Sequence, residues 1–286
     1  MLITGCSTGI GRATAQRLAR AGRRVYATAR NLDSIQDLAD ADCTVLSLDV
    51  TSEPSMREAV AAVEAAQDAV GVLVNNAGYG LHGAAEEADQ DEVRRQFETN
   101  VFGPARLVQL VLPGMRRQGW GKIVNVSSMG GRLTFPGGAF YHASKHALEA
   151  FSDALRFEVR PFGVDVIVIE PGIVRTRFDE TAIGTIRDSD SEGGQPGPYD
   201  EFNANLTATI HGAYSGPLSR LSVSPERVAR TIERAVSAHR SRTRYVVPSP
   251  VRGLLLARRV LPDRAFDAML RTSYRPPGPG ASSDSA

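Results

Sequence analysis

Three glycines near the amino terminus constrain the fold of this chain more than any other feature. Gly5, Gly9 and Gly11 follow a short apolar segment at 2–4 and precede residues 12–21, whose pattern predicts a helix. Glycine lets a chain turn sharply and lets its backbone approach a diphosphate, and the first amides of the helix would face that anion. Strand, turn and helix together predict a dinucleotide-binding unit.

Short apolar segments alternate with amphipathic stretches along the rest of the chain, which is typical of a parallel sheet covered by helices. The expected strands are residues 2–4, 24–29, 44–48, 70–74, 122–126, 164–169 and 244–247. The expected helices are residues 12–21, 54–66, 91–117, 140–160 and 225–239. We therefore expect an α/β fold, doubly wound around a seven-stranded parallel sheet.

The pattern indicates one domain over residues 1–250, because folds of this kind commonly reach ~200–250 residues. Glycine, proline, serine and aspartate cluster at 173–223, and we expect this insert to be a mobile substrate lid rather than a surface insertion without a role. Residues 251–276 predict a basic amphipathic helical extension. Docking on its own domain is favoured over contact with a membrane surface or partner. Residues 277–286 are expected to form a disordered tail.

Charge and cysteine content exclude several partners. The chain has 33 basic and 32 acidic residues, a net charge of +1, which favours neither nucleic acid nor anionic lipid as a partner. No segment approaches the ~18 consecutive apolar residues of a membrane span. Cys6 and Cys43 form neither a disulfide framework nor a metal-ligand spacing. We expect a cytoplasmic protein that binds a small molecule and no metal.

Four further motifs follow the glycine-rich turn at 4–11. They are Asn75-Asn76-Ala77-Gly78, Ser128, Tyr141-His142-Ala143-Ser144-Lys145 and Pro171-Gly172. With the glycine spacing GxxxGxG, they resemble the short-chain dehydrogenase/reductase family over about residues 2–239. The resemblance implies a Rossmann fold with strand order 3-2-1-4-5-6-7 and helices on both faces, and a nicotinamide-dependent interconversion of a carbonyl and an alcohol.

The residue that ends the second expected strand bears on which nicotinamide cofactor binds. An acidic residue about twenty positions beyond the glycines holds the ribose of NAD, whereas an arginine there suits the 2′-phosphate of NADP. Here Ala29 ends the strand and Arg30 follows, and a guanidinium can bind a phosphate through two parallel hydrogen bonds. NADP(H) is the expected cofactor. NAD(H) is the alternative if Arg30 only faces water and Asp33 supplies the carboxylate.

Other candidate cofactor contacts come from the glycine-rich turn and from the resemblance. Ser7 could donate to the 2′-phosphate. The resemblance implies adenine contacts at 49–50, ribose contacts at 76–78 and nicotinamide contacts at 171–176. The candidate cofactor residues are Gly5, Ser7, Thr8, Gly9, Ile10, Gly11, Arg30, Asp49, Val50, Asn76, Ala77, Gly78, Tyr141, Lys145, Pro171, Gly172, Ile173 and Thr176.

The candidate catalytic residues are Asn100, Ser128, Tyr141 and Lys145. Tyr141 and Lys145 lie four residues apart on an expected helix, so both side chains share one face. A nearby ammonium and an oxidised nicotinamide would lower the tyrosine pKa from about 10, which suits Tyr141 as general acid in reduction and general base in oxidation. Ser128, preferred over Ser127 by the family's spacing, would bind the substrate oxygen.

By resemblance, Lys145 also binds the nicotinamide ribose, and Asn100 holds a water in a proton relay to that lysine. Bonding of Asn100 to the backbone of its own helix is the alternative. Tyr79 and His82 could touch substrate, whereas His142 should face elsewhere, because successive helical residues point about 100° apart. Aromatic residues at 135, 140 and 178 are candidate pocket walls or plain core.

The sequence thus predicts an NADP(H)-dependent oxidoreductase. Its glycine turn and length resemble the branch of 17β-hydroxysteroid and retinol dehydrogenases, which implies an apolar, steroid-, retinoid- or polyketide-like ketone, aldehyde or alcohol as substrate. The alternatives are an extended-type sugar-nucleotide epimerase and a binding protein that senses NADP without turnover. Residues 91–117 and 140–160 resemble the family's subunit-pairing helices, which implies a homodimer or homotetramer.

Overall fold

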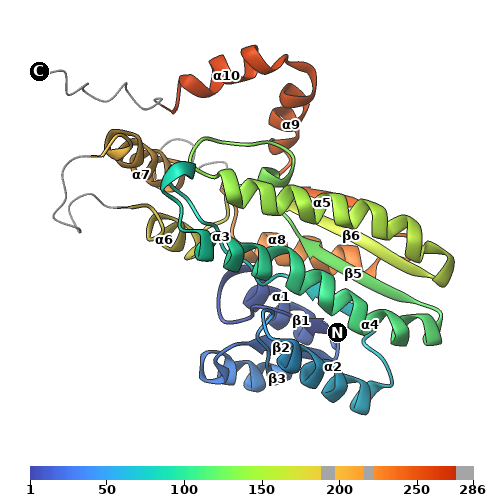
Figure 1. Ribbon diagram of the computed structural model, residues 1–286. Helices are drawn as coiled ribbons and strands as arrows, with labels where there is room; N and C mark the ends of the chain where they lie inside the picture. Colours follow the sequence, from blue (N-terminus) through green and yellow to red (C-terminus); the bar gives the residue numbers. More distant parts are fainter. Residues whose placement is uncertain (188–196, 216–221, 275–286) are drawn as a thin grey trace, which may run out of the picture.

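A single parallel sheet forms the centre of the molecule (Figure 1). The computed structural model describes residues 1–187, 197–215 and 222–274. The strands are β1 (Leu2–Ile3), β2 (Val25–Ala29), β3 (Cys43–Ser47), β4 (Val72–Asn75), β5 (Gly121–Val126), β6 (Val164–Pro171) and β7 (Arg244–Val247). They pair in the order β3-β2-β1-β4-β5-β6-β7, and every pairing is parallel. The predicted seven-stranded, doubly wound fold is confirmed.

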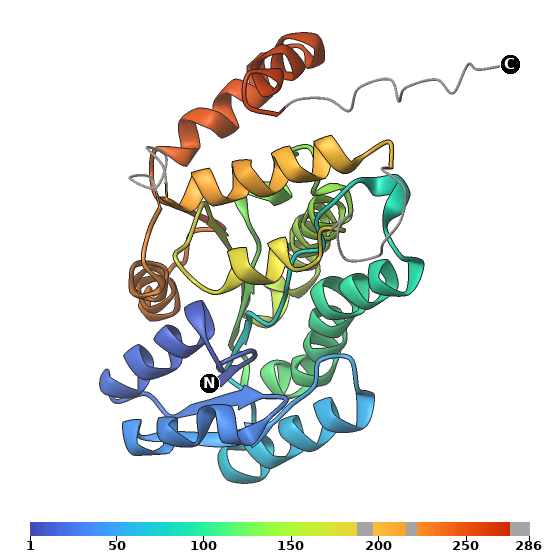
Figure 2. The same cartoon turned by 90° about the vertical axis from the view of Figure 1, so that its left-hand side faces the viewer.

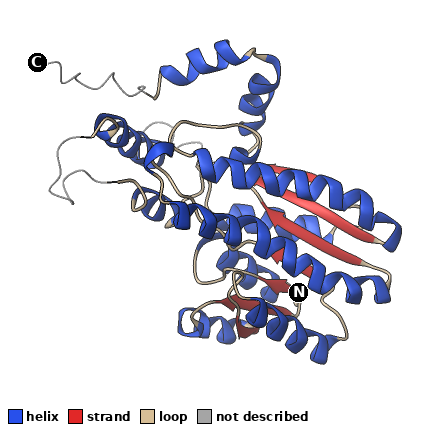
Figure 3. Cartoon of the chain, in the orientation of Figure 1, coloured by secondary structure: helices blue, strands red, loops and turns tan. Residues whose placement is uncertain are grey.

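Helices cover both faces of this sheet, as Figure 3 shows. The helices α1 (Gly9–Arg20) and α8 (Pro225–Ser237) bury Leu18 and Ile232 in one apolar cluster. The helices α2 (Glu53–Gln67), α4 (Gly103–Gln118) and α5 (Ala139–Val159) bury Val60, Leu107 and Leu155 in a second. Because both faces are covered, strands such as β6 are apolar at nearly every position.

The helix expected over 91–117 is interrupted. It consists of α3 (Gln90–Phe97) and α4, joined by a π-helical turn over Glu98–Phe102 that includes Asn100. Such wide turns frequently occur at functional sites, because the extra residue moves one side chain out of the regular helical positions. Asn100, within this turn, bonds the backbone of the neighbouring loop at Tyr79.

The described parts of the segment at 173–223 are partly helical. They contain α6 (Phe178–Ile183) and α7 (Asp200–Ser215), neither of which the polar composition predicts. Val174 and Val223 pair as an isolated parallel bridge, so the two ends of the segment lie side by side. Mobility of this segment stays a prediction.

The carboxyl-terminal extension forms two helices instead of the single helix expected. The backbone at Leu261 is extended, because the ring of Pro262 disfavours the helical conformation in the residue before it. This extended residue separates α9 (Val251–Val260) from α10 (Asp263–Arg271). Leu255 and Phe266 pack on Leu133 of the main domain. Figure 2 shows α9 and α10 at the end of the molecule that also carries α7. The expected disordered tail at 277–286 lies outside the described residues.

Among the described residues, no helix is both long and apolar enough to cross a membrane. The same residues contain no group of His, Cys, Asp and Glu side chains that could hold a metal ion.

Candidate active site

A cavity of about 860 Å³ opens at the carboxyl ends of the strands. Strand order reverses between β1 and β4, and ligands of open α/β sheets bind in the crevice beside such a reversal. The glycine-rich turn forms one end of the cavity and the carboxyl-terminal end of β6 forms another wall. The third side comes from α6, α7 and Tyr274, beyond α10.

The glycine-rich turn is closely packed against the segment after β4. Gly5 and Gly9 have φ values of +70° and +58°, which residues with a side chain rarely adopt. A Cβ on Gly11 would lie 2.3 Å from the Gly5 carbonyl oxygen and 2.4 Å from Asn76 Nδ2. Asn76 Nδ2 donates to the carbonyl oxygens of Thr4 and Gly5 at 2.9 and 3.1 Å. This backbone has no side chains at its glycines and is held in place by Asn76, and the amides at the start of α1 suit the negative charge of a cofactor diphosphate.

The end of β2 carries a cation and no carboxylate. Arg30 is exposed and lines the cavity together with Ser7 and Ala29. Asp33 does not line it; its backbone amide bonds Asn31 Oδ1 at the start of a 3₁₀ segment. Asp49 lines the cavity after β3, and its Oδ1 accepts hydrogen bonds from the amide and hydroxyl of Thr51. Arg30 therefore adds a positive charge to the cavity wall next to the glycine-rich turn.

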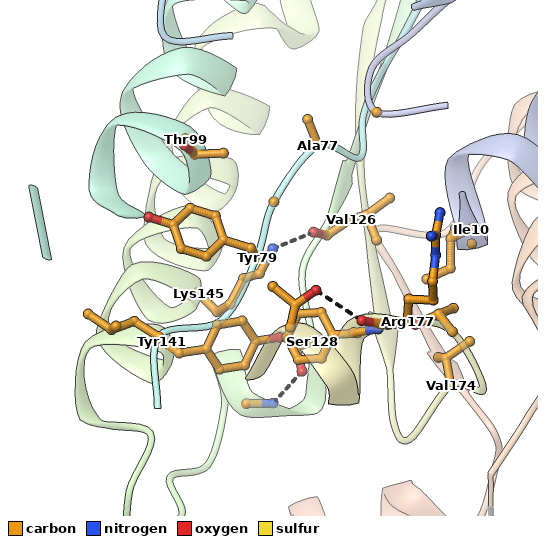
Figure 4. A pocket seen from close by; sticks show the side chains of 18 of the residues that line it. Ile10, Ala77, Tyr79, Thr99, Val126, Ser128, Tyr141, Lys145, Val174 and Arg177 are labelled. Carbon is orange, nitrogen blue, oxygen red and sulfur yellow. Dashed lines mark hydrogen bonds between the residues drawn. The ribbon is translucent and has the colours of Figure 1, made fainter. Parts of the chain in front are cut away.

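Three polar side chains converge on the middle of the cavity (Figure 4). Tyr141 and Lys145 come from successive turns of α5, and Ser128 follows β5. Lys145 Nζ donates to the carbonyl oxygen of Val126 at 3.0 Å, and Ser128 Oγ accepts from the amide of Gly130 at 3.0 Å. Backbone contacts thus fix both groups beside the tyrosine.

Burial dominates the electrostatics of these groups. It raises the pKa of Tyr141 to about 12, although a hydrogen bond with Ser128 acts in the opposite direction. Burial lowers the pKa of Lys145 to about 8, and the negative charge of Glu149 opposes that change. The expected lowering of the tyrosine pKa requires the positive charge of an oxidised nicotinamide in addition to the lysine, and it stays a prediction. In the chain alone, burial thus favours the neutral form of both side chains.

Asn100 acts on the backbone next to these residues. Its Nδ2 donates to the carbonyl oxygen of Tyr79 at 2.9 Å and to Ser144 Oγ at 3.0 Å, and its Oδ1 accepts from the Tyr79 amide. A Cβ on Gly78 would lie 2.9 Å from that Oδ1 and 3.5 Å from Lys145 Nζ. Asn100 therefore joins the segment after β4 to α5, beside the lysine but outside the cavity lining.

A buried pair of carboxylates lies behind Lys145. Glu149 follows the lysine by one helical turn, and Glu170 of β6 is 0% exposed. Arg244 reaches Glu149 at 3.0 Å and Glu170 at 3.1 Å, while Arg132 lies 3.6 Å from Glu170. Burial, reinforced by the charge of Glu149, raises the pKa of Glu170. Our sequence reasoning missed this group, although a glutamate inside an apolar strand signals a buried ion pair.

The structure brings most of the expected site residues together. All of the candidate catalytic and cofactor residues line the cavity except Asn100 and Gly11, which support it from behind. Tyr79, His82, Phe135 and Phe178 also line it, whereas Phe140 does not.

His142 lines the cavity as well, contrary to our expectation. Its Nδ1 lies 3.1 Å from the Gly130 carbonyl oxygen, which holds the ring on this side of α5, and burial lowers its pKa to about 4.

The lining residues that sequence reasoning missed include four from the last third of the chain. Leu206, Ile210 and Tyr214 occupy one face of α7, and Tyr274 stacks on Phe135 with ring centroids 6.2 Å apart. The four-residue spacing of the first three is a helical signal that the surrounding polar residues obscured. No comparable signal precedes Tyr274.

Fold and site together define a nicotinamide-type oxidoreductase of the Rossmann class. Residues 1–185 match the family described as short chain dehydrogenase, and the chain belongs to that family. A probable short-chain type dehydrogenase/reductase, VdlC of Helicobacter pylori, is 35% identical over 94% of this chain and 96% of its own length. A 3-ketodihydrosphingosine reductase of Bacteroides thetaiotaomicron is 42% identical over 63% of this chain and 65% of its own.

Solved structures agree with this assignment. A short-chain dehydrogenase from Streptomyces avermitilis has a TM-score of 0.77 and 35% identity over 95% of this chain and 94% of its own. The closed form of serine dehydrogenase complexed with NADP+ has a TM-score of 0.73 and 26% identity, and the match covers 86% of this chain and 93% of its own. A short chain dehydrogenase/reductase from Burkholderia phymatum in complex with NAD shares the fold. Its TM-score is 0.75 and its identity 24%, and the match covers 97% of this chain and 95% of its own.

Proposed function

We propose that this protein is an NADP(H)-dependent oxidoreductase that reduces an apolar ketone or aldehyde to the alcohol. The convergence of Ser128, Tyr141 and Lys145 on one cavity wall, beside a bare glycine-rich turn, carries the proposal. Bound NADPH would supply a hydride to the carbonyl carbon. The protein's part is to bind the carbonyl oxygen and to protonate it.

Reduction of a carbonyl needs a proton donor beside the oxygen that becomes the alcohol. Because the pKa of Tyr141 is about 12, its hydroxyl is a phenol at neutral pH and can donate a proton to the forming alkoxide. The Ser128 hydroxyl donates a hydrogen bond to the same oxygen, and the Lys145 ammonium stabilises the phenolate that the proton transfer leaves behind. In the reverse direction the phenolate of Tyr141 would act as the general base, and the positive charge of oxidised nicotinamide would favour that phenolate.

Arg30 supports NADP(H) over NAD(H), because its guanidinium can bind the 2′-phosphate and no carboxylate at the end of β2 repels it. An Arg30→Asp variant should bind NADPH at least tenfold more weakly than the wild type and NADH no more weakly. Fluorescence titration measures both affinities. An unchanged ratio of the two would remove Arg30 from the phosphate site.

An apolar substrate fits the wall farthest from the glycine-rich turn. Leu206, Ile210 and Tyr214 of α7 and the stacked rings of Phe135 and Tyr274 line this part of the cavity. The similarity to a 3-ketodihydrosphingosine reductase supports a long-chain ketone, and the 17β-hydroxysteroid and retinol branch remains our proposal for the wider class.

The test combines NADPH oxidation on a panel of apolar ketones with the variant Tyr141→Phe. We expect turnover by the wild type and at least a hundredfold loss of kcat in the variant, with NADPH affinity kept. An equally active variant would refute the acid role. Cofactor binding without turnover on any ketone would indicate a sensor, and conversion of a sugar nucleotide without net NADPH use would indicate an epimerase.

We further propose a homodimer or homotetramer formed through α4 and α5. Phe157 on α5 is 84% exposed and Phe102, before α4, is 55% exposed, and such apolar surface is typical of contact sites. A cytoplasmic location is part of the same proposal, supported by the two free cysteines.

A further inference from the structure

A second concave site lies along β7, the edge strand of the sheet. It has a volume of about 840 Å³ and is bounded by α8, β7 and the start of α9. Tyr245, Val246, Val247 and Pro248 provide an aromatic and apolar wall. Its size falls in the ~300–1,000 Å³ range of small-molecule sites. None of its lining residues belongs to the lining of the first cavity.

This groove concentrates positive charge. The arginines that line it are Arg175, Arg227, Arg230, Arg234, Arg240, Arg242 and Arg252. The only acidic residue in the lining is Glu226. The chain as a whole has a net charge of only +1, so the excess is local.

Most of these guanidinium groups have no partner within the described ranges. Arg175 donates to the hydroxyl and carbonyl oxygens of Ser222. Glu226 is held by Ser224 and by the charge of Arg175. The side chains of the other six arginines make neither an ion pair nor a hydrogen bond with any residue that the structure describes.

These arginines are exposed and solvated, and a bound anion would relieve the repulsion between them. Arg227, Arg230 and Arg234 lie on one face of α8 at spacings of three and four residues, and like charges at these spacings destabilise a helix. One alternative is that the arginines only protect the edge strand β7 from pairing with another chain, which would place the charges along β7 itself. However, the cation of β7 itself, Arg244, is bound inward by Glu149 and Glu170. The groove's arginines instead converge from α8, the loop before β7 and α9.

The shape and charge favour a small oligophosphate over larger partners. Arginine binds phosphate oxygens in a two-pronged geometry, and several arginines around one concave site can bind several phosphates. A second copy of this chain is a poor fit, because a two-fold contact would place arginines against arginines. We propose that this groove binds an anionic small molecule carrying two or more phosphate groups.

The groove is connected to the cavity of the proposed reaction. Arg175 lines the groove, while its neighbours Val174 and Thr176 line the first cavity. Gly172 of the first cavity donates its amide to the carbonyl oxygen of Val247, a groove residue, at 2.7 Å. A ligand bound to Arg175 therefore contacts the segment that closes the nicotinamide end of the proposed active site.

Calorimetry with inorganic triphosphate as the probe tests the proposal on the full chain. We expect saturable binding in the presence of saturating NADPH, weakened by added salt. The double variant Arg230→Ala, Arg234→Ala should lose at least tenfold in affinity for triphosphate and keep its affinity for NADPH, which also shows that it folds. The matched control Arg23→Ala, Arg160→Ala removes two exposed arginines that line neither site and should bind triphosphate within twofold of the wild type.

Several results would overturn the proposal. They are absence of binding at millimolar triphosphate, equal weakening in both double variants, and displacement of triphosphate by NADPH. Tighter binding of a nucleic acid duplex or of anionic vesicles through the same arginines would also overturn it, because the ligand class would then be a macromolecule or a lipid surface. Because NADPH affinity is measured in parallel, failure here is distinguishable from failure of the proposed reaction.

Discussion

Replacement of Gly11 by alanine should damage both stability and cofactor binding. The new Cβ would lie 2.3 Å from the Gly5 carbonyl oxygen and 2.4 Å from Asn76 Nδ2, and neither can retreat without moving the turn. Overpacking of this kind costs about 1–3 kcal/mol. Loss of the two hydrogen bonds of Asn76 adds about 0.5–1.5 kcal/mol each. Alanine's better helix propensity returns about 1 kcal/mol.

We therefore expect Gly11→Ala to lower the free energy of unfolding by about 3 kcal/mol. Urea denaturation followed by circular dichroism measures this change, and fluorescence titration should show at least tenfold weaker NADPH binding. Gly253→Ala is the control, because Gly253 is also helical but has nothing within 4 Å of its would-be Cβ. It should gain about 0.5–1 kcal/mol. A Gly11→Ala protein with wild-type stability and NADPH affinity would refute the packing argument.

Three further predictions concern buried charge and surface. Burial lowers the pKa of His142 from 6.5 to about 4, so between pH 6.5 and about 4 the unfolded chain binds more protons than the folded one. The free energy of unfolding should therefore fall by about 3 kcal/mol as the pH falls through this range. The urea midpoint of a His142→Gln variant should depend less on pH over the same range. An Arg244→Leu variant leaves the carboxylates of Glu149 and Glu170 buried without their shared cation, so it should lose about 3 kcal/mol of unfolding free energy at pH 8. The loss should be smaller at acidic pH, because burial raises the pKa of Glu170 and favours its protonated form. An equal loss at both pH values would contradict this. Phe157→Lys should reduce the mass that light scattering gives at micromolar concentration to that of the monomer, and an unchanged mass would place the interface elsewhere.

The sheet and much of the proposed site could be predicted because their signals are local. Apolar strands buried on both faces are visible as short runs, as in β6, and Tyr141 and Lys145 share a helix face by spacing alone. The glycine-rich turn could be predicted because Gly5 and Gly9 adopt positive φ values and Gly11 has no room for a side chain, so only glycine suits these three positions.

What could not be predicted depends on contacts between distant segments. Tyr274 reaches the cavity only because α9 and α10 fold back onto Leu133, and no local pattern encodes that return. The direction of the Tyr141 pKa shift depends on how completely the ring is enclosed by other elements. His142 faces the cavity because of one bond to Gly130, which lies twelve residues away.

The bridge between Val174 and Val223 gives the region after β6 the character of an exchangeable cassette. This stretch leaves and rejoins the domain at adjacent points, and its described helices α6 and α7 line the cavity between them. The stretch between these two valines therefore carries Leu206, Ile210 and Tyr214 of the proposed substrate wall, whereas Ser128, Tyr141 and Lys145 lie outside it. Exchange of the apolar α7 side chains alone should therefore change the proposed substrate preference more than the proposed proton transfer.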